Sequence, residues 1–136
     1  MEAIKDVHIP SLHTFFLTWP VIRAEHLSQF LYSHASTLLA VDLRDPHFYR
    51  SSESDVLDLI RTLKACTELE FLYFFGGTIF HGTVVFEGLN FVWCEHDEDD
   101  DDWMLVHCCE GLCFDDYEEV QCGLAQAIEG LRILPS

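Results

Sequence analysis

Ten residues in the second half of the chain, Cys-Glu-His-Asp-Glu-Asp-Asp-Asp-Asp-Trp at positions 94–103, concentrate groups that could bind a cation or a basic protein. Seven of them are acidic: Glu95, Asp97, Glu98, Asp99, Asp100, Asp101 and Asp102. Carboxylates at this density can bind divalent metals, pair with Lys and Arg of another protein, or form a solvated loop without further role. The adjacent Trp103 favours a protein interface, because aromatic side chains are enriched at binding surfaces.

A second acidic cluster follows at positions 115–119. It consists of Asp115, Asp116, Glu118 and Glu119, with Tyr117 among them. The helix macrodipole accounts for one or two acids at the start of a helix and leaves the others without a structural reason. The net charge of −17 is concentrated in this half of the chain. Residues 65–136 hold sixteen acids and one base, whereas residues 1–64 hold eight acids and six bases. Such a field repels nucleic acid and anionic membranes and attracts basic proteins.

Metal-binding patterns near the acidic run are incomplete. Asp97, Asp99 and Asp101 alternate like the first ligands of an EF-hand, but Asp102 stands where that loop needs glycine and Cys108 where it needs glutamate. The surrounding cysteines and histidines match neither a paired C-x2-C site nor an H-E-x-x-H helix. They are Cys94, His96, His107, Cys108, Cys109 and Cys113. We therefore expect no metal and no cofactor, and zinc at these cysteines and histidines stays open as an alternative.

Catalytic motifs are missing from the sequence. There is no G-x-S-x-G, and Gly76-Gly77 is followed by neither a lysine nor a helix, so we expect a hairpin turn there rather than a phosphate loop. The sequence therefore predicts a protein that is not an enzyme and has no small-molecule substrate.

The elements that must position the acidic clusters follow from hydrophobic periodicity and cap residues. In the first half they are a strand over Leu12–Trp19, a helix over 22–35, a strand over Leu38–Leu43, a turn at Arg44–His47 and a helix over 53–66 capped by Ser52 or Ser54. In the second half they are strands over Glu70–Phe75, Thr78–Glu87, Leu89–Cys94 and Trp103–Cys108, and a helix from Asp115 or Asp116 to Leu131. The acidic run is then the tip of a hairpin.

These elements predict one domain, residues 1–136, of the α/β or α+β class. We expect a mixed, largely antiparallel sheet with about three helices packed on it, and no internal repeat. No apolar run reaches the roughly 18 residues of a membrane span, and the N-terminus lacks a signal pattern. We therefore expect a cytoplasmic protein whose six cysteines are reduced.

In their mixture of acids and aromatics, Glu95–Trp103 and Asp115–Glu119 resemble the inhibitory faces of bacterial immunity proteins, such as barstar and the immunity proteins of nuclease colicins. The resemblance covers about 25 residues and involves no family motif. It implies a small antitoxin-type inhibitor whose carboxylates take the place of nucleic-acid phosphates in the basic cleft of a cognate toxin domain. The implied partner-binding residues are the seven acids of the run, Trp103 and the five residues 115–119.

Two alternatives use the same charges. One is a phage-type nucleic-acid mimic that blocks a DNA-binding defence protein. The other is a non-enzymatic adaptor domain whose acidic loop only maintains solubility. In none of these readings does the protein bind nucleic acid directly.

Overall fold

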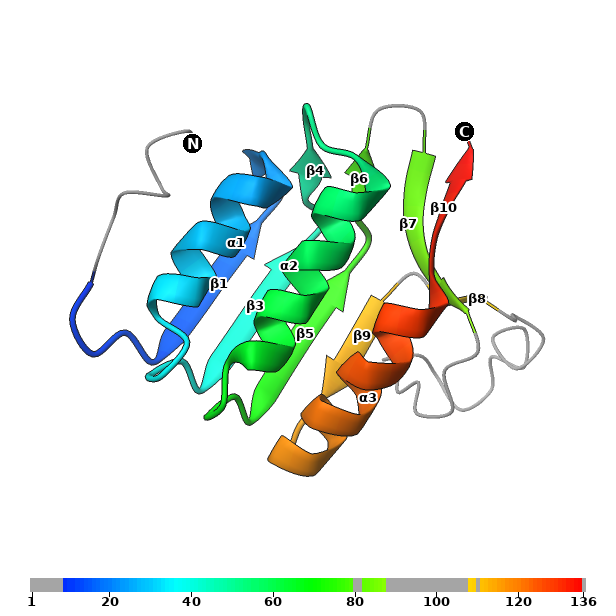
Figure 1. Ribbon diagram of the computed structural model, residues 1–136. Helices are drawn as coiled ribbons and strands as arrows, with labels where there is room; N and C mark the ends of the chain where they lie inside the picture. The colour runs from blue at the N-terminus through cyan, green and yellow to red at the C-terminus, as the bar shows by residue number, and fades with distance from the viewer. Residues whose placement is uncertain (1–8, 80–81, 88–107, 110, 136) are drawn as a thin grey trace.

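The computed structural model describes residues 9–79, 82–87, 108–109 and 111–135, with the backbone alone for Cys108 and Cys109. Three helices and two mixed sheets make up this part of the chain (Figure 1). The prediction of an α/β or α+β fold with mixed strand pairing and about three helices is confirmed, and the class is α+β. The helices are α1 (Ala24–Ser33), α2 (Glu53–Ala65) and α3 (Tyr117–Gly130).

The first sheet has the strand order β1-β3-β5-β9. Its strands are β1 (Thr14–Thr18), β3 (Ala40–Arg44), β5 (Phe71–Phe75) and β9 (Gly111–Phe114). The first three are parallel, and β9 is antiparallel to β5. β9 was not predicted from the sequence.

The second sheet has the order β10-β7-β6-β4-β2, and β8 pairs with β7 off this path. Its strands are β2 (Val21–Ile22), β4 (His47–Phe48), β6 (Thr78–Ile79), β7 (Gly82–Glu87), β8 (Cys108–Cys109) and β10 (Leu131–Pro135). β2, β4 and β6 are parallel, and β7 is antiparallel to β6, β8 and β10. Parallel pairing therefore has a larger share in the described strands than the sequence predicts.

Three strands continue from the first sheet into the second across a row of kinks. Trp19-Pro20, Asp45-Pro46 and Gly76-Gly77 separate β1 from β2, β3 from β4 and β5 from β6. The register is the same on both sides of the row. The hydrogen-bond ladder also runs through it, with Trp19 N–H donating to the Arg44 carbonyl at 2.7 Å and Asp45 N–H to the Phe75 carbonyl at 2.7 Å. A strand–kink–strand–helix unit thus occurs twice and begins a third time, a structural repetition that the sequence prediction missed.

The kinks correct the prediction for residues 76–87. Gly76-Gly77 is not a hairpin turn, because β6 continues in the direction of β5 and pairs in parallel with β4. Thr78–Glu87 is not one strand either: β6 and β7 are antiparallel, with Ile79 opposite Gly82. Glycine supplies positive φ for a kink as readily as for a hairpin, so the residue types alone do not distinguish the two. The predicted turn at Arg44–His47 likewise bends the chain without reversing it.

The helices cover one face of the first sheet (Figure 1). Right-handed crossovers from β1 to β3 and from β3 to β5 place α1 and α2 on the same side. α3 follows β9, which is antiparallel to β5, and therefore runs opposite to α1 and α2 (Figure 1). The core draws on this helical layer and on both sheets; its largest side chains include Phe30, Phe48, Phe74, Phe86 and Phe114. Burying one such side chain contributes roughly 1.5–3 kcal/mol.

The start of α2 confirms the predicted cap. Ser52 Oγ accepts a 3.2 Å hydrogen bond from Asp55 N–H, and an Asp55 carboxylate oxygen accepts one of 2.9 Å from Ser52 N–H. This reciprocal capping box satisfies two backbone donors that have no partner within the helix. Among the described helices none could cross a bilayer, since α3, the longest, has 14 residues where about 20 apolar ones are needed.

Candidate functional site

The part of the acidic surface that the structure describes is the start of α3. Phe114, the last residue of β9, is buried, and the chain then passes through Asp115 and Asp116 into the helix. Val120 and Leu124 bury one side of the helix in the core. Gly123 lies against the Phe114 ring so closely that a Cβ at this position would overlap it. This packing fixes the orientation in which the five residues 115–119 leave the sheet.

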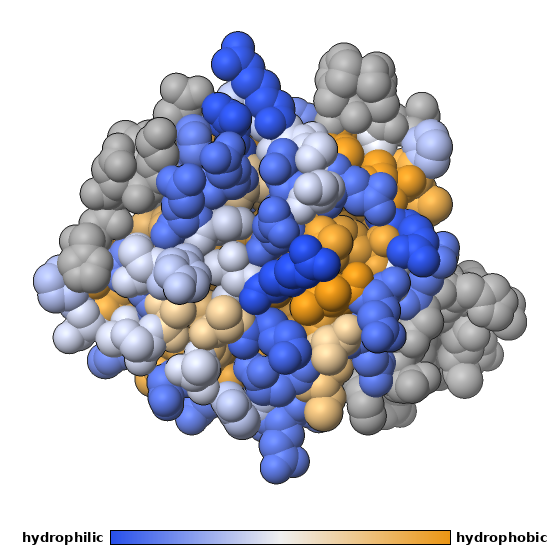
Figure 2. Space-filling view, in the orientation of Figure 1, coloured by the Kyte–Doolittle hydropathy of each residue, from blue (hydrophilic) through white to orange (hydrophobic). Residues whose placement is uncertain are grey.

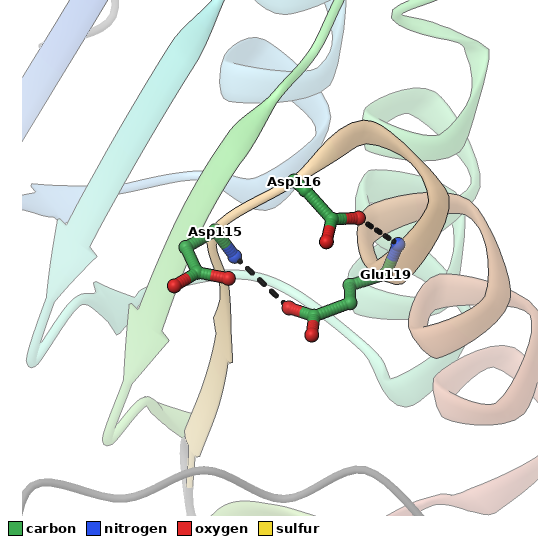
Figure 3. Close-up of side chains that lie close together, drawn as sticks. All are labelled: Asp115, Asp116 and Glu119. Atoms are coloured by element: carbon green, nitrogen blue, oxygen red, sulfur yellow. Dashed lines mark hydrogen bonds between the residues drawn. The ribbon is translucent and has the colours of Figure 1, made fainter.

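Asp116 caps α3, as the sequence predicts for Asp115 or Asp116. Its Oδ1 accepts a 2.8 Å hydrogen bond from Glu119 N–H. The Glu119 side chain turns back toward the strand, and its Oε2 accepts a 3.3 Å hydrogen bond from Asp115 N–H (Figure 3). Two of the four acids thus satisfy backbone donors at the start of the helix, and for Asp115 and Glu118 the structure offers no such structural task.

This arrangement holds like charges close together. One carboxylate oxygen from each of Asp115, Asp116 and Glu119 lies within 4.8 Å of the other two (Figure 3). The hydrogen bond from Asp115 N–H lowers the pKa of Glu119, but contact with the Asp115 carboxyl, partial desolvation and the charges of Asp116 and Asp115 together outweigh it and raise the pKa. A cation among these oxygens, either a metal ion or a Lys or Arg side chain, would relieve the repulsion.

The remaining members of the cluster are open to solvent. Glu118 is exposed, and Tyr117 exposes 46 % of its surface. Within the described residues, none of the acids at positions 115–119 forms an ion pair. Arg132, which is the base of the acidic half, lies beyond the other end of α3, where its Nε is 3.8 Å from a Glu87 carboxylate oxygen.

The structure brings together only part of the predicted site. Asp115, Asp116, Tyr117, Glu118 and Glu119 lie together at the start of α3. The acidic run 95–102 and Trp103 lie outside the described residues, as do the predicted strand Leu89–Cys94 and residues 103–107 of the next. In the described residues the one group of three His, Cys, Asp or Glu side chains within metal-binding distance is Asp115, Asp116 and Glu119. Of the cysteines and histidines considered for zinc, Cys113 is half-buried on β9.

The sequence prediction missed a second exposed surface, along the outer edge of β1 and β2. Phe16, Trp19 and Val21 are all exposed there. The sequence feature that could have revealed this surface is the absence of any Asp, Glu, Lys or Arg from residues 9–22 of a strongly charged chain. The face that carries the helices is by contrast largely hydrophilic around a hydrophobic patch (Figure 2).

Comparisons of the chain with protein-family models, with curated proteins and with solved structures found no match.

Proposed function

We propose that the protein is an inhibitor that binds a basic protein through its acidic surface. The surface consists of residues 115–119 at the start of α3 together with Glu95–Asp102 and Trp103. The observation that carries the proposal is the set of four acids at one helix start, of which none is neutralised by an ion pair in the described residues. Three of their carboxylates are near enough to repel one another, which destabilises the free protein and is relieved when cationic side chains bind.

Helix capping alone does not account for the cluster. Asp116 and Glu119 accept the hydrogen bonds that a cap needs. Asp115 and Glu118 add charge beside the half-exposed Tyr117. An aromatic side chain among unpaired carboxylates suits an interface that buries an anchor within a charged rim.

The partner that best fits this chemistry is a toxin domain that acts on nucleic acid. Such domains hold phosphates with clustered Lys and Arg, and a row of carboxylates can occupy the same positions. Long-range attraction between the two surfaces would also speed association. We place this inhibitor in the cytoplasm, in keeping with the free thiols of Cys66 and Cys122.

The test compares two charge reversals in equivalent places. Glu118 and Glu53 are both exposed acids in the first turn of a helix, so changing either to lysine has a similar effect on the helix dipole. Glu53 begins α2, whose start lies at the opposite end of the helical layer from the start of α3 (Figure 1). Wild type, Glu118→Lys and Glu53→Lys are immobilised and exposed to a lysate of the source organism at low and high salt. Captured proteins are identified, purified and assayed for nuclease activity with each variant.

The proposal predicts that wild type and Glu53→Lys capture a basic protein and inhibit its nuclease activity, whereas Glu118→Lys binds it more weakly. High salt should release the partner, because screening weakens exposed charge pairs. Equal capture and inhibition by Glu118→Lys would overturn the role of the α3 cluster. Capture of a DNA-binding defence protein without nuclease activity would favour the nucleic-acid-mimic alternative.

A further inference from the structure

The outer edge of β1 has no strand beside it in the described part of the chain. β1 is the terminal strand of the first sheet and pairs only with β3 there. The His13 carbonyl accepts from Ala40 N–H, and Trp19 N–H donates to the Arg44 carbonyl. Because backbone groups alternate in direction along a strand, Thr14, Phe16 and Thr18 point their N–H and C=O groups away from β3.

Within β1 this edge lacks the side chains that normally prevent strand addition, and the nearest proline is Pro20 in the kink. Exposed edges are commonly protected by charged side chains, proline or bulges. At the edge of the second sheet, β10 contains Arg132 and Pro135. β1 is Thr-Phe-Phe-Leu-Thr and has neither a charge nor a proline. Phe16 exposes 61 % of its surface, and Trp19 and Val21, which continue the same edge, expose 73 % and 57 %.

We propose that β1 binds β1 of a second copy of this chain, antiparallel and about a two-fold axis at Phe16. An edge with alternating donors and acceptors is complementary to itself in this arrangement, as an isologous dimer requires. The outward groups of Thr14, Phe16 and Thr18 would bond to those of Thr18, Phe16 and Thr14 of the partner subunit. The two four-stranded sheets would then form one continuous sheet.

The side chains suit this register. Phe16 would lie directly opposite Phe16 of the partner subunit, and Thr14 opposite Thr18 of the partner subunit; aromatic pairs and Thr–Thr pairs are favourable across antiparallel strands. On the helical face, Phe15 would lie opposite Leu17 of the partner subunit. Phe15 and Leu17 are partly buried against the core, so the dimer would extend apolar packing across the axis.

The charge distribution favours a second copy as the occupant. Residues 9–22 carry no Asp, Glu, Lys or Arg, so the edge offers nothing to select a charged partner. The acids of α3 follow β9, at the opposite end of the strand order from β1. Pairing through β1 therefore places the two acidic clusters at the outer ends of the dimer, where their mutual repulsion is smallest.

Sedimentation equilibrium over a wide concentration range tests the proposal. Wild type should approach twice the chain mass of 15.7 kDa, and added salt should leave the dimer unchanged or strengthen it by screening the net negative charge. Phe16→Lys should remain monomeric, because two lysines would be directly opposite each other. Leu134→Lys makes the same charge change at an exposed apolar residue of β10 and should still dimerise. Circular dichroism checks that each variant is folded.

A cross-link tests the register. Paired residues of this kind have Cα atoms about 5.5 Å apart, within disulfide range, so Phe16→Cys should give an oxidised dimer that the native cysteines of wild type do not give. A wild type that is monomeric at every concentration overturns the proposal. So does a folded Phe16→Lys that dimerises like wild type, or a Phe16→Cys that fails to cross-link. The acidic-surface interaction is separable, because salt should weaken it and Phe16→Lys should leave it intact.

Discussion

The Trp19 indole Nε1–H donates a 3.1 Å hydrogen bond to a carboxylate oxygen of Asp45, and both residues have left-handed backbone, with φ of 54° and 50°. Left-handed φ is unfavourable for a bulky residue such as tryptophan. The two residues are neighbours in the row of kinks that joins the sheets, and the third member, Gly76, has φ of 74°. The left-handed backbone of Trp19, which is unfavourable for that residue alone, is thus held in place within a row that includes Asp45 and Gly76 on the two neighbouring parallel strands.

Gly76→Ala tests how strongly this row depends on glycine. Alanine at positive φ costs roughly 1–3 kcal/mol, and the added Cβ would also overlap Asp45 Oδ1. We expect chemical denaturation to show at least this loss in the free energy of unfolding. Gly76→Asn is the informative control, because asparagine tolerates left-handed backbone. If Gly76→Asn loses as much unfolding free energy as Gly76→Ala, the loss comes from the overlap with Asp45 and not from the left-handed backbone. An unchanged unfolding midpoint for Gly76→Ala would show that the kink does not depend on glycine.

The kink row also shows why part of the fold was not predictable. The sequence narrows the cap of α2 to Ser52 or Ser54 and that of α3 to Asp115 or Asp116, because a cap and the helix after it are local in sequence. Trp19-Pro20 and Asp45-Pro46 share a proline that Gly76-Gly77 lacks, and the equivalence of all three appears only when the strands lie side by side. β9 is four residues long, and its assignment depends on pairing with β5, far away in the sequence.

In the candidate site, too, local features could be predicted from the sequence and long-range or side-chain features could not. Periodicity and capping rules place Asp115–Glu119 at the start of a helix, and the structure confirms this position. That Glu119 turns back to Asp115 N–H, and so brings three carboxylates together, depends on side-chain conformation and could not be derived from spacing. The open edge of β1 was also missed: the uncharged stretch 9–22 marks the segment, but only the strand order shows that it is outermost.

Thiol reactivity should distinguish Cys66 from Cys122. Burial raises the pKa of the Cys66 thiol to about 12, and its Sγ lies 3.4 Å from the Thr62 carbonyl as a weak donor. Cys122 is exposed on α3. Since the thiolate is the reactive form, mild alkylation of the native protein should modify Cys122 and leave Cys66 intact, as read by peptide mass spectrometry. Unfolding in denaturant should make both react; fast labelling of native Cys66 would contradict its burial.

Glu119→Gln should stabilise the protein at neutral pH. The raised pKa means that the folded state favours protonated Glu119 more than the unfolded state does. The stability gained from protonation is therefore fully present below the unfolded pKa and is lost as pH rises through the folded pKa. Glutamine keeps an oxygen for Asp115 N–H without the charge, so the melting temperature should rise at neutral pH, and the gain should shrink in acid. Glu118→Gln, which removes a charge in the same turn but outside the group of three carboxylates, is the matched control.

Reversal of Asp99–Asp102 to lysine tests the proposed inhibitory surface as a whole. If these carboxylates meet Lys and Arg of the toxin domain, the variant should lose about 2–5 kcal/mol of binding free energy, the cost of breaking a buried, hydrogen-bonded charge pair at an interface. Folding should be unchanged or slightly more stable, because replacing four of the seven acids at positions 95–102 relieves repulsion within the run. Titration calorimetry against the purified partner and thermal melting measure the two quantities separately.

Trp103→Ala should mainly raise the rate constant for dissociation of the complex. Reversing peripheral acids mainly slows association, since long-range attraction steers the encounter, whereas removing an aromatic anchor speeds dissociation of the formed complex. Stopped-flow association and surface-plasmon-resonance dissociation rates at two salt concentrations distinguish these effects. Salt should narrow the difference in association rate between wild type and the lysine variant and leave the effect of Trp103→Ala largely unchanged. A lysine variant that binds and protects as well as wild type would show that the acidic run is a solvated segment with no part in recognition.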